Sequence, residues 1–189
     1  IGPVSGSAHL SIFYKMPGIK IFSPHTPDEY KKIYKEFTKD KDVYYISEHR
    51  KSYDNVKSSK NYLKKNSDIT ILLNSITRES ANDIKKYFDK TKYKLSIIHL
   101  YRLKPFKLSS KEINTIKQTK NFIMICDNDY EDGLPAIIKS KISDYNMKAK
   151  IEILGLPYKT AGHHPKVDVL PPNTRKIISK IEYLLKRNF

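Results

Sequence analysis

The sequence predicts an α/β protein with three layers, in which a mostly parallel β-sheet is covered by helices on both faces. Two observations lead to this prediction. Short runs rich in Ile, Leu and Val alternate along the chain with longer segments whose apolar residues recur at helical spacing. Several of the short runs are apolar at every position, which is typical of strands buried on both faces in parallel sheets.

The first elements are two strands separated by a helix. Residues 19–22 form an apolar run that ends at Ser23-Pro24, and residues 43–46 form the next one. Between them, Thr26 supplies an N-cap, a proline follows at the first helical position, and Glu29 completes a capping box. One apolar stripe follows at helical spacing, made of Tyr30, Ile33, Tyr34 and Phe37.

Residues 51–67 are polar and carry little apolar pattern, so they are expected to form a linker on which Tyr62 and Leu63 dock against a neighbour. The alternation then restarts. Strands are predicted at 69–73, 95–98, 122–126 and 150–154. A helix is predicted at about 80–89, with Ile84, Tyr87 and Phe88 inward. A second capping box, at Ser109 and Glu112, predicts the start of another helix. Two more helices are predicted at about 134–143 and after Pro171-Pro172-Asn173.

This pattern divides the chain near residues 53–67. The segment 68–189 is long enough for one α/β domain. The segment 1–52 holds two strands and a helix, too little to cover a sheet on both faces. We therefore expect residues 1–52 to be the back end of a larger domain whose front is missing or supplied by another chain.

The net charge is +16 and the isoelectric point is near 9.7, which raises the question of nucleic-acid binding. Only five of the 36 basic residues are arginine, the residue favoured for bidentate contacts with bases and phosphates, and the lysines are spread along the chain. Lysine-rich composition drift explains this charge better than a nucleic-acid partner does.

Other function classes are excluded more directly. The single cysteine, Cys126, rules out an internal disulfide framework and a Cys-based zinc site, and it suits a reducing compartment such as the cytoplasm. No apolar run reaches the ~18 residues of a membrane span, and the first residues show no export-signal layout. The six glycines never fall in a phosphate-binding pattern.

Four polar clusters are candidate sites. His163-His164 could be half of a metal site, but adjacent residues in extended chain point to opposite faces, so a loop position is favoured. The segment 127–133 follows a buried strand and is expected to cap the next helix rather than hold a cation. His9 lies in a Gly/Ser-rich loop that could expose its imidazole to a ligand. Residues 48–50 end a strand, where ligand crevices form in open α/β sheets, although a strand-end salt bridge is the simpler alternative.

The order of these segments resembles the C-terminal half of the thiamine diphosphate enzymes of the transketolase and 2-oxoacid dehydrogenase E1 β-subunit type. No one motif is decisive, and the resemblance rests on order and spacing over nearly the whole chain. The segments that carry it are Gly2-Pro3-Val4, residues 9–24, residues 43–53 with Glu48-His49-Arg50, Asp68-Ile69-Thr70-Ile71, residues 100–106, Asp132-Gly133-Leu134 and Leu170-Pro171-Pro172-Asn173.

The resemblance implies that residues 1–52 are the remnant of a pyrimidine-binding domain, 53–67 a linker and 68–189 a transketolase C-terminal-like domain. It implies thiamine diphosphate and Mg²⁺ as cofactors, a small keto substrate, and a carbanion that attacks the substrate carbonyl. Because active sites of this family lie between subunits, it also implies a homodimer, or a heteromer with a chain that supplies the diphosphate-binding domain.

Two departures bear on activity. The glutamate that contacts the cofactor's aminopyrimidine lies, in the family, upstream of residue 1, and the diphosphate and Mg²⁺ site belongs to another domain or chain. Ser5 stands where the family has a histidine, and His9 matches a second, less universal histidine. A serine does not shuttle protons at neutral pH as an imidazole does. Ser5 and His9 are the candidate catalytic residues, Glu48, His49 and Arg50 the candidate substrate-binding residues, and no metal ligand is assigned.

The expected function is therefore the C-terminal portion of a transketolase-like transferase, which contributes part of an active-site wall and a dimer interface but is incomplete for catalysis alone. Glu48-His49 favours instead the E1 β branch, whose complex is an oxidoreductase. A non-catalytic assembly module of the same fold is the alternative that Ser5 favours.

Overall fold

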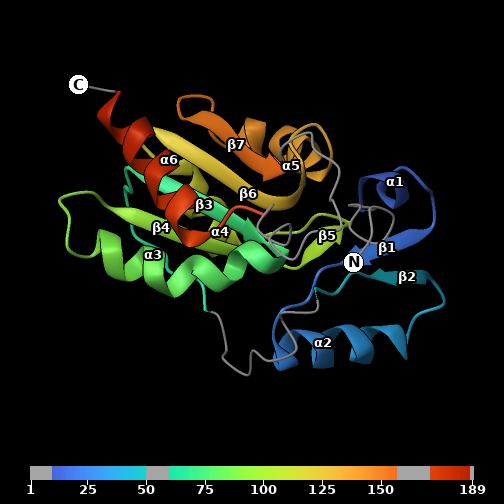
Figure 1. Ribbon diagram of the computed structural model, residues 1–189. Coiled ribbons are helices and arrows are strands. Elements are labelled where there is room, and N and C mark those ends of the chain that lie inside the picture. The colour runs from blue at the N-terminus through green and yellow to red at the C-terminus, as the bar shows by residue number, and fades with distance from the viewer. Residues whose placement is uncertain (1–9, 50–59, 157–170, 188–189) are drawn as a thin grey trace, which may run out of the picture.

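The computed structural model describes residues 10–49, 60–156 and 171–187. These residues form two sheets that lie side by side (Figure 1). The smaller sheet has the strand order β2-β1-β5 and the larger one the order β4-β3-β6-β7. The strands are β1 (Ile19–Phe22), β2 (Val43–Ile46), β3 (Ile69–Asn74), β4 (Leu95–Leu100), β5 (Arg102–Lys104), β6 (Phe122–Tyr130) and β7 (Lys150–Leu156).

The helices are α1 (Leu10–Tyr14), α2 (Pro27–Phe37), α3 (Ala81–Phe88), α4 (Ser110–Lys117), α5 (Leu134–Ile142) and α6 (Thr174–Lys186), with the 3₁₀ helices η2 (Ser75–Ser80) and η3 (Ser143–Tyr145). Within the described ranges, no helix has the length and apolar character needed to cross a membrane.

The larger sheet is parallel throughout, as the apolar runs predicted. β3 pairs in parallel with β4 and β6, and β6 pairs in parallel with β7. All six residues of β3 and of β4 are buried. Alternate side chains of these strands face two separate cores, because successive residues of a strand point to opposite faces. The predicted α/β/α layering is confirmed.

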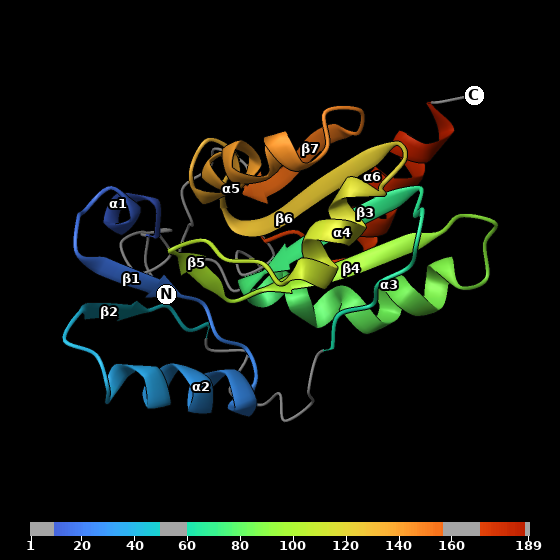
Figure 2. The same cartoon turned by 180° about the vertical axis from the view of Figure 1, so that it is seen from behind.

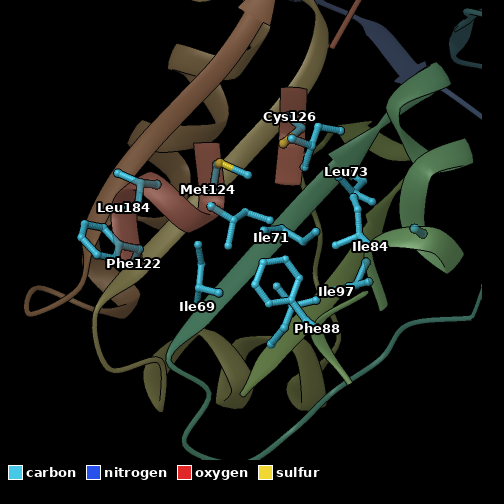
Figure 3. Packing of buried hydrophobic residues seen from close by; sticks show 14 of the residues in the cluster. Ile69, Ile71, Leu73, Ile84, Phe88, Ile97, Phe122, Met124, Cys126 and Leu184 are labelled. Atoms are coloured by element: carbon cyan, nitrogen blue, oxygen red, sulfur yellow. The ribbon is translucent and has the colours of Figure 1, made fainter. Parts of the chain in front are cut away.

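One core lies between this sheet and helices α3 and α6, as Figure 3 shows for Ile71, Ile84 and Leu184. The second core lies on the opposite face, under α4 and α5, and it also includes Leu10 of α1 and Ile21 of β1. This second core is continuous across both sheets, so it fixes how they sit together.

The smaller sheet is built from segments that are distant in sequence. β1 pairs in parallel with β2 and antiparallel with β5, which follows β4 after a single residue. Helices α1 and α2 lie on opposite faces of β1 and β2 (Figure 2). The sequence did not predict β5, because a three-residue strand with one apolar side chain, Leu103, carries no alternating pattern.

Most predicted elements are confirmed, with two local corrections. The Thr26–Glu29 and Ser109–Glu112 capping boxes form as expected, and residues 60–63 dock on the larger sheet through a Tyr62–Ile97 bridge. The prediction that Tyr87 faces inward is wrong: its side chain is 40% exposed and its hydroxyl donates to Glu182 Oε1 at 2.5 Å. The helix expected from about residue 80 is preceded by the 3₁₀ turn η2.

Candidate functional site

The strand-end cluster predicted at residues 48–50 begins where β2 stops. The Ser47 amide donates to the Phe22 carbonyl at 2.8 Å, which extends the β1–β2 pairing by one residue. Glu48 is then exposed and His49 half-buried. Arg50 lies outside the described residues, as do Ser5, His9, His163 and His164. The grouping of Ser5 and His9 with Glu48, His49 and Arg50 therefore stays a prediction.

A charge cluster, made of the buried Glu29, Arg78, His25 and His99 with the exposed Glu79 at its edge, joins the two sheets where α2 begins. The Arg78 side chain is fully buried, and its two Nη atoms donate to Glu29 Oε1 at 2.7 Å and Oε2 at 2.9 Å. This bidentate geometry is the strongest form of arginine–carboxylate pairing. Glu29 therefore has two roles, the ion pair with Arg78 and the capping box of α2 with Thr26. Its Oε2 also accepts the backbone amide of His25 at 2.9 Å.

The two histidines of the cluster flank the guanidinium. Arg78 Nε donates to His99 Nδ1 at 3.3 Å, and Arg78 Nη1 donates to the Leu100 carbonyl. Burial, with the nearby Arg78 charge, lowers the pKa of His99 to about 3, so this imidazole is neutral at physiological pH. Burial first, and the Arg78 charge second, also lower the pKa of His25, whose Nε2 lies 2.9 Å from Glu79 Oε1.

A pocket of about 360 Å³ opens beside this cluster, where β4, β5 and the start of α4 meet. Six of its eight lining residues have polar or charged side chains, and the other two are leucines. Arg102 is held there by an ion pair with Glu36 of α2 and by packing over the Phe22 ring at 5.2 Å. The residues that line it are His99, Leu100, Tyr101, Arg102, Lys107, Leu108, Ser109 and Glu112.

A second buried polar group lies at the carboxyl ends of β3 and β6. In the strand order β4-β3-β6-β7, the connection after β3 runs to β4 on one side and the connection after β6 runs to β7 on the other. The point between β3 and β6 is therefore a topological switch point, where ligands bind in open α/β sheets. Asn74 Nδ2 donates to both carboxyl oxygens of Asp127, at 3.1 and 3.0 Å. Burial raises the pKa of Asp127 to about 7.

Asp129 settles the role expected of residues 127–133. Its Oδ2 accepts the Leu134 amide at 3.0 Å, which is the helix-capping contact predicted for this segment. Nowhere in the described ranges do three His, Cys, Asp or Glu residues gather closely enough to hold a metal ion. Burial raises the pKa of the Cys126 thiol well above its usual range, so it is not a nucleophile.

Sequence reasoning missed Arg78, His99 and Asn74. Arg78 lies in a short 3₁₀ turn among polar residues, which gives it the signal of a surface position. Asn74 is the last residue of β3, and His99 is the last but one of β4. A polar residue that closes an otherwise apolar strand is the signal that could have found them, because such strand ends face the crevice of an open sheet.

The comparisons with known proteins identify the fold. No family model and no curated protein matches the chain. Among solved structures it is similar to an inactive β4 tetramer of a split-gene transketolase, with a TM-score of 0.69 and 13% identity over 95% of this chain. It is also similar to a histidine-to-phenylalanine mutant of transketolase from Pichia stipitis, with a TM-score of 0.68 and 16% identity over 98% of this chain.

At this level of identity the similarity establishes the fold alone. This chain has the α/β fold of the C-terminal region of transketolases, as the resemblance in the sequence implied. The chain spans 62% of the split-gene protein and 28% of the Pichia stipitis protein.

Proposed function

We propose that this chain is the C-terminal portion of a thiamine diphosphate-dependent transketolase-like enzyme. The observation that carries the proposal is the similarity to two transketolase structures over 95% and 98% of this chain, which includes both sheets and the join between them. Residues 1–52 would then be part of a pyrimidine-binding domain, 53–67 a linker and 68–189 the C-terminal domain.

The smaller sheet supports the idea that more protein covers this end. Strand β2 has β1 on one side, and no described strand pairs with its other edge. Unpaired strand edges are usually covered in native proteins. The large apolar side chains that are exposed on the elements around this sheet are Ile12, Met16, Tyr34, Phe37 and Val43. Tyr34 and Phe37 belong to the apolar stripe predicted for α2, and about half of each side chain is exposed among the described residues.

Residues outside this chain would complete the cofactor-binding site. The described residues do not fit a Mg²⁺ site, since no three candidate ligands gather among them, and no step is assigned to the metal in this chain. When bound, thiamine diphosphate supplies the carbanion that attacks a keto substrate. The role proposed for Glu48, His49 and Arg50 is to line the substrate side of the site, and that proposed for His9 is to move a proton at its imidazole.

The assembly that this function needs is a homodimer or a heteromer. The split-gene relative forms a β4 tetramer that is inactive. By analogy, this chain would self-associate and gain activity only with a chain that carries the diphosphate-binding domain.

An activity assay tests this proposal. The chain is combined with its diphosphate-binding counterpart, thiamine diphosphate and Mg²⁺, and ketol transfer between phosphorylated sugars is measured. A His9→Gln variant is expected to lower kcat by roughly 10²-fold, the scale of general acid–base catalysis, with little change in KM. Lys32→Gln, on the exposed face of α2, serves as the control and should change kcat little. Equal activity of both variants and the wild type would contradict the role of His9.

The second candidate is a non-catalytic assembly module of the same fold. Ser5 in place of the family histidine favours it. A stable complex with no turnover of sugars, or of 2-oxoacids as the E1 β alternative requires, would select this candidate.

A further inference from the structure

A basic pocket lies at the amino ends of β6 and β7, beside the C-terminal end of α6. It has a volume of about 400 Å³, within the size range of small-ligand sites. In Figure 1 this end of α6 and the starts of these strands lie away from α1, β1 and β2. The pocket is therefore separate from the strand-end residues discussed above. Its lining residues are Lys120, Asn121, Phe122, Lys148, Lys150, Leu184 and Arg187.

Four of these seven residues are cations, and none of the lining residues is acidic. Lys120 Nζ lies 3.6 Å from an Asp68 oxygen, and Lys150 Nζ lies 2.8 Å from a Glu152 oxygen, so two cations are partly neutralised.

Lys148 and Arg187 differ from them, because neither has a carboxylate within ion-pair distance in the part of the chain that the structure describes. The four cations thus leave a local excess of positive charge.

The backbone that carries these cations is held in place from below. The side chain of Asn146 is buried, and its Nδ2 donates to the backbone carbonyls of Ile116 and Thr119, each at 2.8 Å. Asn146 Oδ1 accepts the amides of Lys148 and Ala149, each at 3.0 Å. The backbone that carries Lys148 is therefore held in place beside the pocket, which lowers the ordering cost of binding.

The other walls are fixed in the same way. The Lys150 amide donates to the Asn121 carbonyl at 2.9 Å, and the Lys120 amide donates to the Ser67 carbonyl at 2.9 Å. The Arg187 guanidinium packs over the Tyr183 ring at 5.0 Å, one turn back along α6. Like charges gathered around one pocket repel one another, and an anion placed between them relieves that repulsion.

We propose that this pocket binds a compact polyvalent anion of the phosphate-ester class. Phosphate oxygens accept the point-charge hydrogen bonds of lysine and the forked donors of arginine. A compact ligand fits better than a nucleic acid, because the cations converge on one concave site rather than follow a line along the surface. This inference does not depend on the proposed enzymatic function.

Calorimetric titration of the whole chain with inorganic tripolyphosphate at 50 mM NaCl tests the proposal. The wild type is expected to show saturable binding that weakens at 200 mM NaCl. The double variant Lys148→Ala/Arg187→Ala is expected to raise Kd at least ~10-fold, through two lost charge-assisted contacts. The matched control Lys31→Ala/Lys32→Ala removes the same net charge from the exposed face of α2 and should change Kd less than about twofold.

Three results would overturn the proposal. The first is no saturable binding of tripolyphosphate by the wild type at 50 mM NaCl. The second is an equal loss of affinity in both double variants, since binding would then follow net charge alone. The third is a 12-base-pair DNA duplex that binds through Lys148 and Arg187 while tripolyphosphate does not, which would make this face a nucleic-acid surface.

Discussion

Among single residues, Arg78 of η2 joins two other elements through one guanidinium: α2 by Glu29, and the end of β4 by His99 and Leu100. Removing one partner of a buried ion pair leaves the other charge uncompensated. Arg78→Ala should therefore lower the free energy of unfolding by about 3–5 kcal/mol, measured by urea denaturation. Lys85→Ala, which breaks an exposed i,i+4 pair with Asp89, should cost far less, because solvent screens that pair. A loss below about 1 kcal/mol for Arg78→Ala would contradict this account of the cluster.

Asp127 gives a pH-dependent prediction. Its pKa is about 7 in the folded chain against an ordinary value of 3.8, so the folded state holds this proton more tightly than the unfolded state. Its contribution to stability is fully present below about pH 4 and is lost as the pH rises to about 7, by up to ~1.4 kcal/mol per unit. His99 acts in the opposite direction, since its lowered pKa costs stability as the pH falls below about 6.5.

Comparison with Asp127→Asn isolates the carboxyl group. The side chain stays nearly isosteric, and Asn74 Oδ1, which has no hydrogen-bond partner among the described residues, can turn to accept from the new amide. The difference in unfolding free energy between wild type and variant should fall from pH 4 to pH 7 and then level off, as followed by urea denaturation. A difference that is constant with pH would contradict the raised pKa.

At the scale of elements, Gly133 determines how α5 starts. A Cβ built at Gly133 would lie 2.8 Å from Asp129 Oδ2, the atom that caps the helix. Gly133→Ala should therefore destabilise the chain by about 1–3 kcal/mol. The double variant Asp129→Ala/Gly133→Ala removes the obstacle, so its loss should be smaller than the sum of the two single losses. Additive losses in thermal or urea unfolding would show that the contact with Asp129 is not the cause.

The sequence predicts elements that depend on neighbouring residues, but not contacts between distant ones. Strands and capping boxes depend on neighbouring residues, so apolar runs and the Thr26–Glu29 spacing were enough to place them. Strand β5 and the Arg78–Glu29 pair depend on residues 49 or more positions apart, which no local pattern encodes. Tyr87 was misplaced because helical spacing cannot distinguish a core residue from one at the edge of the buried face. Of the residues predicted to form the site, only Glu48 and His49 lie in the described part of the chain.

For the whole molecule, the two sheets are joined by β5, by the charge cluster and by a shared apolar core. The open edge of β2 and the exposed apolar side chains near it remain on the smaller sheet. Most of the 36 basic residues are spread along the chain, and four of them, Lys120, Lys148, Lys150 and Arg187, line a pocket at the far end of the larger sheet. The molecule thus presents one face suited to a protein partner and another suited to an anion.

The central claim, that this chain needs further protein to form a thiamine diphosphate site, is tested most directly by calorimetry. The chain is titrated with thiamine diphosphate in the presence of Mg²⁺, first alone and then assembled with the protein that supplies the diphosphate-binding domain. The proposal predicts no saturable heat from the chain alone and one-site binding by the assembly. Binding of the cofactor by the chain alone, with the affinity of the assembly, would contradict it.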